Sequence, residues 1–325
     1  MLPPFAYSRP GHIQDAVERL AQAGAHVHAG GTDLLGCLRD GVFPAELLVS
    51  LSGIDGLAGV ETRDDGGLAI GAMTTIAEVA GHPAVRQRYP VLAQAAAEVG
   101  SPQLRNQGTL GGNLCQKPRC WYYRGDFPCL RKGGYKCFAV NGENQDHCIL
   151  GGANCFIVHP SDTAPALVAL DAEVHTLGPR GARRIPVAKL HMPPADNPTR
   201  ETVLEPGEIL VQISLPPPPD GLYSAFRKVR ARRAWDFAVA GAALALAMDG
   251  QRVADCRIVL AGAAPIPWRA QEAEAALRGK TLDDAVIAEV AAAVVANAQP
   301  MSKNAYKLPL FKGLMTEELL KAKGV

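Results

Sequence analysis

The sequence has almost no excess charge of either sign, because 33 Lys and Arg residues face 32 Asp and Glu residues and give a formal net charge of +1. Domains that bind nucleic acid usually carry a clear basic excess, so this balance gives no support to that function. No apolar run approaches the roughly 20 residues that a membrane span requires, and we expect none. Residues 1–5 lack the basic start and apolar core of a secretory signal, which favours a cytoplasmic location.

Several catalytic and nucleotide-binding motifs are also missing. There is no Gly-x-Gly-x-x-Gly fingerprint, and no Gly-Lys-Ser or Gly-Lys-Thr follows the glycine pair Gly30-Gly31, so neither a Rossmann site nor a P-loop is predicted. The chain contains no His-Glu-x-x-His motif, and Ser161 near His159 has no nucleophile-elbow motif around it. These absences give no support to a metalloprotease or a serine hydrolase.

Hydrophobic periodicity predicts an α+β chain of two domains. The first covers residues 1–220, with a small lobe at 1–57 and a larger lobe at 58–220, and a stiff proline segment at 216–219 separates it from a second α+β domain at 222–325. The expected helices cover residues 13–23, 75–79, 91–99, 162–170, 271–277, 282–298 and 303–320, the last interrupted by Pro309. The expected strands cover residues 27–29, 47–51, 67–72, 156–158, 172–177, 183–187, 209–215, 223–229, 239–248 and 254–261.

Two glycine-rich segments stand out, one in each lobe of the first domain. The first is Ala29-Gly30-Gly31-Thr32-Asp33-Leu34-Leu35, directly after a predicted strand, and the second is Thr109-Leu110-Gly111-Gly112-Asn113. Without side chains, backbone N–H groups approach an anion closely, so two such turns converging from separate lobes would clamp a diphosphate. Taken alone, a Gly-Gly pair is more often an ordinary turn.

The stretch from Thr109 to Thr163 is rich in cysteine and has no clear helix or strand period. It holds six of the eight cysteines of the chain, namely Cys115, Cys120, Cys129, Cys137, Cys148 and Cys155. A loop this long is uncommon unless something other than a core orders it, and thiolates around a metal centre would do so. Iron–sulfur clusters accept irregular spacings, whereas zinc usually shows close Cys-x2-Cys pairs, which are absent here. Zinc and unligated thiols remain the alternatives.

The two glycine segments, at this separation, resemble the FAD-binding subunit of molybdenum hydroxylases, a family that includes the flavoprotein subunits of xanthine dehydrogenase and carbon monoxide dehydrogenase. The resemblance covers nearly the whole chain. It implies a two-lobed FAD-binding fold of the vanillyl-alcohol-oxidase type followed by a C-terminal α+β domain. The cysteine-rich insert at 115–155 resembles the subgroup of bacterial aldehyde oxidoreductases and 4-hydroxybenzoyl-CoA reductase, whose insert holds an extra [4Fe-4S] cluster.

The resemblance also implies which residues bind the cofactors. The implied FAD contacts are Ala29, Gly30, Gly31, Thr32, Asp33, Leu34, Thr109, Gly111, Gly112, Asn113, Ser161, Asp162, Lys228 and Asp236. Within this set we expect Asp33 to orient or cap, since like charges repel, and Lys228 to lie beside the flavin ring, with a basic edge-strand face as the alternative. The implied cluster ligands are Cys120, Cys129, Cys137 and Cys155. Cys148 and Cys115 are the competing candidates.

The function that the resemblance implies is electron transfer within a heteromeric enzyme, which fits the missing substrate-activating motifs. Its partners would be a large subunit with the molybdenum cofactor and a small subunit with [2Fe-2S] clusters. Electrons would pass between those clusters and an external acceptor, such as ferredoxin, via FAD. The insert looks most like those of aldehyde oxidoreductases. The alternatives are a 4-hydroxybenzoyl-CoA reductase or xanthine dehydrogenase type of enzyme, a stand-alone flavin oxidase, and a zinc-binding scaffold without redox role. A periplasmic location by export with a partner is the alternative to the cytoplasm.

Overall fold

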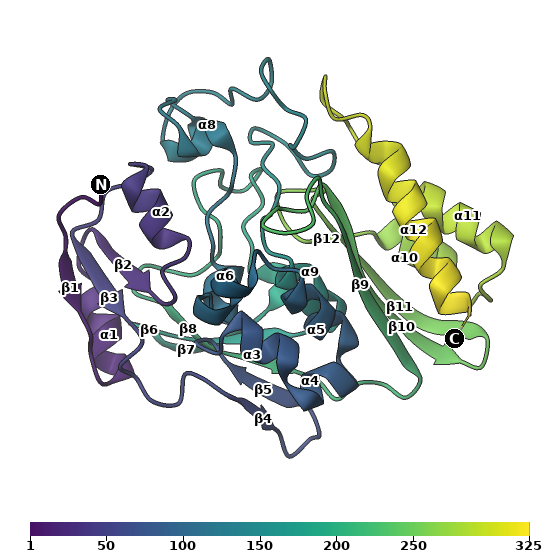
Figure 1. The fold of residues 1–325 in the computed structure, drawn as a ribbon, viewed down its shortest axis with the longest axis horizontal. Coiled ribbons are helices and arrows are strands. Elements are labelled where there is room, and N and C mark those ends of the chain that lie inside the picture. Colours follow the sequence, from purple (N-terminus) through teal and green to yellow (C-terminus); the bar gives the residue numbers. More distant parts are fainter. Residues whose placement is uncertain (325) are drawn as a thin grey trace.

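The computed structural model describes residues 1–324, which three sheets organise (Figure 1). The N-terminal lobe contains a parallel sheet in the order β1-β3-β2. Its elements are β1 (Ala6–Ser8), α1 (Ile13–Leu20), β2 (Ala25–His28), α2 (Leu34–Arg39) and β3 (Leu47–Ser50). Helix α1 buries Ala16, Val17 and Leu20 in a cluster with Val49 of β3, which confirms the apolar face read from its helical spacing.

The larger lobe is built on a five-stranded antiparallel sheet in the order β4-β5-β8-β6-β7. Its strands are β4 (Val60–Thr62), β5 (Leu68–Gly71), β6 (Glu173–Gly178), β7 (Gly181–Pro186) and β8 (Ile209–Leu215). Its helices are α3 (Ile76–Gly81), α4 (Pro83–Arg88), α5 (Pro90–Ala97), α6 (Pro102–Gln107), α7 (Leu110–Leu114) and α9 (Thr163–Ala169), with a short 3-10 turn η2 (Val187–Lys189). Thr75 caps α3 through a reciprocal capping box with Glu78.

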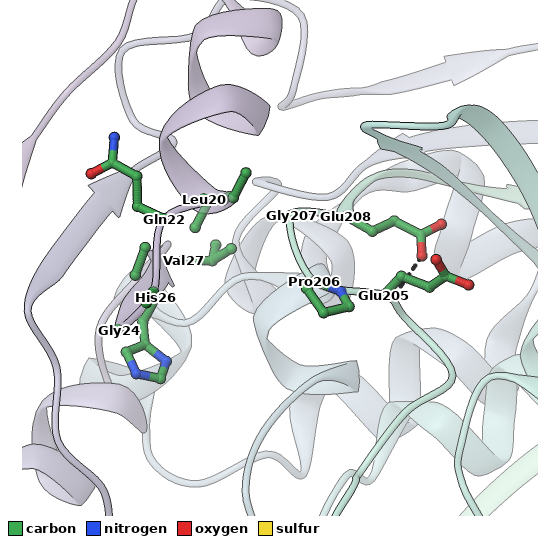
Figure 2. Close-up of a pocket in the computed structure, with 12 residues that line it drawn as sticks. Leu20, Gln22, Gly24, His26, Val27, Glu205, Pro206, Gly207 and Glu208 are labelled. Carbon is green, nitrogen blue, oxygen red and sulfur yellow. Dashed lines mark hydrogen bonds between the residues drawn. The ribbon is translucent and has the colours of Figure 1, made fainter.

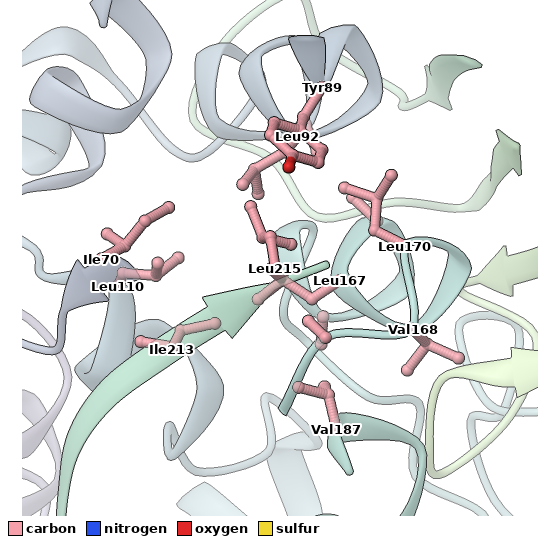
Figure 3. Packing of buried hydrophobic residues seen from close by; sticks show 14 of the residues in the cluster. Ile70, Tyr89, Leu92, Leu110, Leu167, Val168, Leu170, Val187, Ile213 and Leu215 are labelled. Atoms are coloured by element: carbon pink, nitrogen blue, oxygen red, sulfur yellow. The ribbon is translucent and has the colours of Figure 1, made fainter. Parts of the chain in front are cut away.

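The C-terminal part forms an antiparallel sheet in the order β12-β11-β10-β9, with three helices at the right of Figure 1. Its elements are β9 (Leu222–Val229), β10 (Ala240–Asp249), β11 (Arg252–Ala261), β12 (Trp268–Arg269), α10 (Gln271–Leu277), α11 (Asp284–Ala293) and α12 (Lys307–Lys323). Phe226, Ala243 and Val259 of this sheet belong to the core of the larger lobe, where Leu92, Leu167 and Leu215 gather (Figure 3). The two parts on either side of the proline segment therefore share one hydrophobic core.

Three local predictions are wrong. Residues 156–158 form no strand, because Phe156 O accepts from Cys148 N and His159 N donates to Ala264 O, so no regular ladder forms. Pro309 does not interrupt the last helix, because α12 begins at Lys307 and places the proline in the first turn, where no N–H is needed. The predicted helix over 282–298 ends at Ala293.

The cysteine-rich insert crosses the top of Figure 1, and its regular elements in the described chain are the short helix α8 (Trp121–Arg124) and the 3-10 turn η1 (Leu130–Lys132). This agrees with the missing periodicity of its sequence. Within residues 1–324, no helix has both the length and the apolar character needed to cross a bilayer.

Candidate functional site

The first glycine segment turns the chain from β2 into α2. Gly31 has φ +72, a left-handed conformation that glycine adopts without strain. A Cβ on Gly30 would lie 1.9 Å from the backbone oxygen of Gln107, so this glycine permits direct contact with the end of α6. A Cβ on Gly108 would lie 3.5 Å from the hydroxyl of Thr32. The two lobes therefore meet at their glycine segments, as the sequence predicts.

A row of backbone donors lies open in the first segment. In the described chain, the N–H groups of Gly30, Gly31, Thr32 and Asp33 donate no hydrogen bond to another protein group. Thr32 is exposed and its neighbours are half-buried, so these donors are accessible from solvent. Successive N–H groups in a turn form a concave site for an anion. This row fits a diphosphate.

The second glycine segment is the short helix α7 rather than an open turn. Its N–H groups are used internally: Leu110 N donates to Thr74 O, Gly111 N to Ala72 O, and Gly112 N to the hydroxyl of Thr109 at 3.2 Å. A Cβ on Gly111 would lie 2.9 Å from that of Ala72, so this glycine serves close packing. Gly112 is exposed on the side of Ala29, with 4.0 Å between its Cβ position and the Ala29 Cβ. The first segment thus supplies the free donors and the second lies against it.

Asn113 joins the second glycine segment to the start of α9. Its side-chain oxygen accepts hydrogen bonds from Ser161 Oγ at 2.6 Å and from Thr163 Oγ1 at 2.7 Å. Ser161 Oγ in turn accepts from Ala164 N at 3.0 Å and caps the first turn of α9. The structure therefore brings two predicted FAD contacts, Asn113 and Ser161, into one hydrogen-bond network.

Asp162 and Lys228, which the resemblance places at different parts of the flavin, are direct partners. Lys228 Nζ lies 2.7 Å from Asp162 Oδ2 and donates to Glu98 O at 3.1 Å. The lysine side chain is fully buried and the carboxylate is 6% exposed. Burial raises the pKa of Asp162 to about 6, which outweighs the opposing effect of the Lys228 charge. The Lys228 ammonium is thus already neutralised by this carboxylate.

Asp236 braces a loop between β9 and β10. Its carboxylate accepts from Arg232 N at 3.2 Å and from Phe237 N at 3.0 Å. Trp235, the next residue back, has φ 55 and is 68% exposed. Beside this loop, Phe237 lines a small pocket together with Arg119, Val158, His159, Pro160, Ser161, Asp162, Ala238 and Ala261. The pocket joins the segment that leads into α9 and the loop after β9 to Arg119 of the insert.

Asp33 anchors the insert. Its carboxylate accepts from Lys117 N at 2.7 Å and Arg124 Nη2 at 2.7 Å, and it lies 2.9 Å from Arg119 Nη1. Its side chain makes no cap bond to α2. Asp33 is therefore not a cap of α2, and its contacts are with residues far ahead in the chain, while its role toward FAD stays a prediction. Sequence reasoning does not identify these arginines as partners of Asp33, since local spacing carries no signal for this pairing.

Two further anchors hold the insert. Arg131, whose side chain is 2% exposed, donates to Pro198 O at 2.8 Å and Arg200 O at 2.9 Å and pairs with Glu201 at 3.1 Å. The second anchor is the segment before α12, which forms hydrogen bonds with the second half of the insert. These bonds run from Gln299 N to Ile149 O, from Asn304 Nδ2 to His147 O and Cys148 O, and from Lys303 N to Asn144 Oδ1. All three parts of the fold therefore hold the insert.

The thiols of the insert lie near one another. Burial is the main cause that raises the pKa of Cys120 to about 12; backbone hydrogen bonds from Tyr123 and Tyr122 oppose it, and charge on Cys129 and Cys155 adds to it. Burial likewise raises the pKa of Cys155, where Cys137 and Cys129 add to the effect. The pKa of Cys148 is raised by burial and by charge on Cys155 and Cys137. Cys155 thus lies near Cys120, Cys129 and Cys137, and Cys148 lies near Cys155 and Cys137.

The remaining cysteines lie outside this group. The charges that act on the pKa of Cys115, which burial raises to about 12, belong to Lys117 and Glu201. Cys37 and Cys256 are buried in the N-terminal and C-terminal parts. All eight cysteines carry free thiols. A raised pKa keeps a thiol neutral near pH 7 unless a metal takes its proton.

The predicted cluster is not present as an assembled ligand set. Within residues 1–324, no three His, Cys, Asp or Glu side chains converge closely enough to hold a metal ion. Neither the [4Fe-4S] site nor the zinc alternative is supported by such a group, and both remain predictions. His147, which the sequence does not single out, lies with Nε2 3.3 Å from Cys120 Sγ.

A second and larger pocket, of about 400 Å³, lies between the lobes and contains none of the predicted site residues (Figure 2). Residues 20–27 line one side, and residues 205–208 line the other. The two carboxylates of its rim form ion pairs, Glu205 with Arg180 and Glu208 with Arg183. Its polar groups are thus satisfied within the protein, and it offers no free charged donor set.

Two protein-family models and several known proteins are similar to the chain. Residues 3–218 match the family model of the FAD binding domain in molybdopterin dehydrogenase, and residues 224–322 match that of the CO dehydrogenase flavoprotein C-terminal domain. The chain is 37% identical to the aldehyde oxidoreductase FAD-binding subunit PaoB of Escherichia coli K12, over 98% of each chain. It is 29% identical to the carbon monoxide dehydrogenase medium chain of Hydrogenophaga pseudoflava, over 92% of this chain and 89% of that one.

Solved structures agree with these matches. The chain superposes on reconstituted CO dehydrogenase from Oligotropha carboxidovorans with a TM-score of 0.79 and 25% identity, over 100% of this chain and 99% of that chain. Quinoline 2-oxidoreductase from Pseudomonas putida 86 gives a TM-score of 0.78 at 25% identity, over 100% and 98%. The predicted two-lobed FAD-binding fold with its C-terminal domain is thereby confirmed. The chain belongs to the family of FAD-binding subunits of molybdenum hydroxylases and is a subunit of an oxidoreductase.

Proposed function

We propose that this chain is the FAD-carrying electron-transfer subunit of a heteromeric molybdenum hydroxylase that oxidises aldehydes. The observation that carries the proposal is the 37% identity, over 98% of both chains, to a protein named as an aldehyde oxidoreductase FAD-binding subunit. FAD, when bound, supplies an electron carrier that exchanges one or two electrons at a time. The free N–H groups of residues 30–33 support its placement, because they form a donor row suited to a diphosphate.

The other predicted FAD contacts support the proposal through their contacts with that row. Gly112 lies exposed near Ala29, and Asn113 ties the same segment to Ser161. Asp162 and Lys228 form a buried pair at the pocket behind them. In the proposed site this pair sets the position of both side chains and keeps the local charge balanced. Asp236 acts on the loop next to the pocket rather than through a free carboxylate.

We propose in addition that the insert carries a [4Fe-4S] cluster on Cys120, Cys129, Cys137 and Cys155. The charge of Cys155 reaches the Cys120 thiol, and the charges of Cys137 and Cys129 reach the Cys155 thiol, which supports a place for these side chains around one group. A cubane is larger than one ion, so its thiolates stand further apart than the ligands of a single metal. Arg131 lies close enough to lower the pKa of Cys155, which favours a thiolate there.

The proposed partners are a large subunit with the molybdenum cofactor and a small subunit with [2Fe-2S] clusters, with a ferredoxin as the external acceptor. The names of the relatives support a multi-subunit assembly, since they are called FAD-binding subunit and medium chain.

The test is cofactor analysis of the complex purified anaerobically from cells that express all three subunits, followed by addition of an aldehyde. We expect one FAD and about four irons with matching sulfide in this subunit, and loss of flavin absorbance when the aldehyde is added. A complex that contains FAD but no extra iron would support the flavin role and contradict the proposed cluster. A complex reduced by a purine and not by aldehydes would overturn the proposed substrate class.

The ligand set has its own test. Cys137→Ser should lower the iron content of the subunit while FAD stays bound, because one thiolate of the cluster is missing. Cys256→Ser is the matched control, since Cys256 is a buried thiol of the C-terminal sheet far from the insert in sequence. Equal iron in both variants would show that Cys137 is not a ligand.

A further inference from the structure

His28 is the last residue of strand β2 and lies just ahead of the first glycine segment. Its Nε2 lies 2.9 Å from the position that a Cβ on Gly31 would occupy, so the imidazole packs against the backbone of that segment. The residue is half-buried, and its Nδ1 is buried without a hydrogen-bond partner among residues 1–324. His28 therefore adds a titratable side chain to a place where the free donors are backbone N–H groups.

Covalent geometry bounds the distance from this imidazole to the donor row. A Cβ position lies about 2.5 Å from the nitrogen of its own residue, so His28 Nε2 is within about 5.5 Å of Gly31 N. An anion oxygen that accepts from Gly31 N lies about 2.9 Å from that nitrogen. The oxygen and the imidazole are then no more than about 8 Å apart, which is less than the Debye length of about 10 Å at 0.1 M ionic strength. A charge on His28 therefore acts on any anion held there.

The groups around the imidazole provide no counter-charge for it. From β1, the ring of Tyr7 meets it edge to face with 6.0 Å between the centroids. From α2 and β3, the neighbouring residues are Leu35 and Ser50, which carry no charge. The carboxylate of Asp33 is paired with two arginines of the insert. Burial lowers the pKa of His28 below its ordinary value of 6.5, its own backbone carbonyl opposes this, and no charged side chain contributes.

We infer that His28 supplies a pH-sensitive positive charge to the anion site of the first glycine segment, so that its protonation strengthens FAD binding. The inference rests on the proposed flavin role and adds a residue to that site. The diphosphate of FAD stays negatively charged throughout the pH range in which an imidazole titrates, so the change of charge belongs to the protein. An anion beside the ring favours the imidazolium, so FAD binding takes up a proton and the affinity rises as the pH falls.

The test is a titration of the flavin-free, full-length chain with FAD, followed by flavin fluorescence, at several values between about pH 8 and about pH 5. Across this range the dissociation constant of the wild type should fall on the order of fivefold more than that of His28→Gln, the scale of one charge about 8 Å from a diphosphate in water. His26→Gln is the matched control. His26 lies two residues earlier on β2 and is also half-buried, but its Nε2 lies 3.0 Å from Pro44 O. This variant should keep the pH dependence of the wild type.

Each outcome has a separate meaning. Parallel pH profiles of wild type and His28→Gln would overturn the inference and leave the flavin role in place. A wild-type chain that binds no FAD at any pH would overturn the flavin role itself. If His28→Gln does not fold, His28→Lys carries a charge that is fixed over this range, and it must lose the pH dependence that His26→Gln retains. A profile of His28→Lys as steep as that of His26→Gln would show that the charge of His28 is not what varies.

Discussion

Asp33→Asn tests how the glycine segment and the insert are joined. The carboxylate of Asp33 meets Lys117 N at 2.7 Å, Arg124 at 2.7 Å and Arg119 at 2.9 Å. An asparagine keeps one acceptor oxygen but turns an NH2 group toward a guanidinium, so at least one arginine loses its partner. Both arginines would keep their full positive charge in a half-buried place.

The size of the effect follows from these contacts. A hydrogen bond to a charged group contributes about 1.5–3 kcal/mol, and such losses are not additive within one network. The side chains of Asp33, Arg119 and Arg124 are 18%, 30% and 15% exposed, so water screens part of the interaction. We therefore expect Asp33→Asn to lower the free energy of unfolding by about 2–4 kcal/mol.

The assay is urea unfolding of flavin-free protein, with FAD affinity measured on the same samples. Asp40→Asn is the matched control, because the Arg39–Asp40 pair is 64% and 38% exposed and its loss should change stability by about 0.5 kcal/mol or less. If flavin-free Asp33→Asn is as stable as Asp40→Asn, the anchoring role is wrong. A loss confined to FAD affinity would point instead to direct contact between Asp33 and the cofactor.

Two more changes test the site. Gly30→Ala should abolish FAD binding, because the new Cβ would lie 1.9 Å from Gln107 O and force the lobes apart. The control is Gly36→Ala, which should bind FAD normally because nothing lies within 4 Å of its Cβ position. Equal flavin occupancy in the two variants would contradict the close contact between Gly30 and Gln107. Burial raises the pKa of Asp162 to about 6, above its value of about 3.9 in an unfolded chain, so this carboxyl adds stability below about pH 4 that is lost as pH rises through 6. The difference in unfolding free energy, wild type minus Asp162→Asn, should therefore fall between pH 4 and 6, and a flat difference in urea titrations would refute the shifted pKa.

Local patterns in the sequence were sufficient for most of the fold. The apolar face of α1 reflects burial on one side, which helical spacing records directly, whereas β8 is buried at both ends rather than in alternation. The glycine segments were recognisable because close backbone approach leaves few alternatives to glycine. The predicted strand at residues 156–158 was wrong because an apolar run of three residues does not distinguish a strand from a buried loop.

The contacts that determine the geometry of the site could not be predicted from local sequence patterns. Lys228 and Asp162 lie 66 residues apart, and the bond from Asp33 to Arg124 joins residues 91 apart. A charged residue has no periodicity that indicates its partner, so Asp33, Asp162 and Lys228 were all candidates for contact with the cofactor. Only the tertiary arrangement shows that they neutralise one another.

The place of Asp33 has a consequence for assembly. The backbone N–H of Asp33 belongs to the row of free donors, while its carboxylate holds the insert. Binding at the glycine segment therefore alters the rigidity of the insert, and binding at the insert alters the rigidity of the glycine segment. Thermodynamic reciprocity then requires that whatever strengthens binding at the insert strengthens binding at the glycine segment by the same factor. In the subunit proposed above, FAD at the glycine segment would therefore favour loading of the insert, and loading of the insert would favour FAD binding by the same factor.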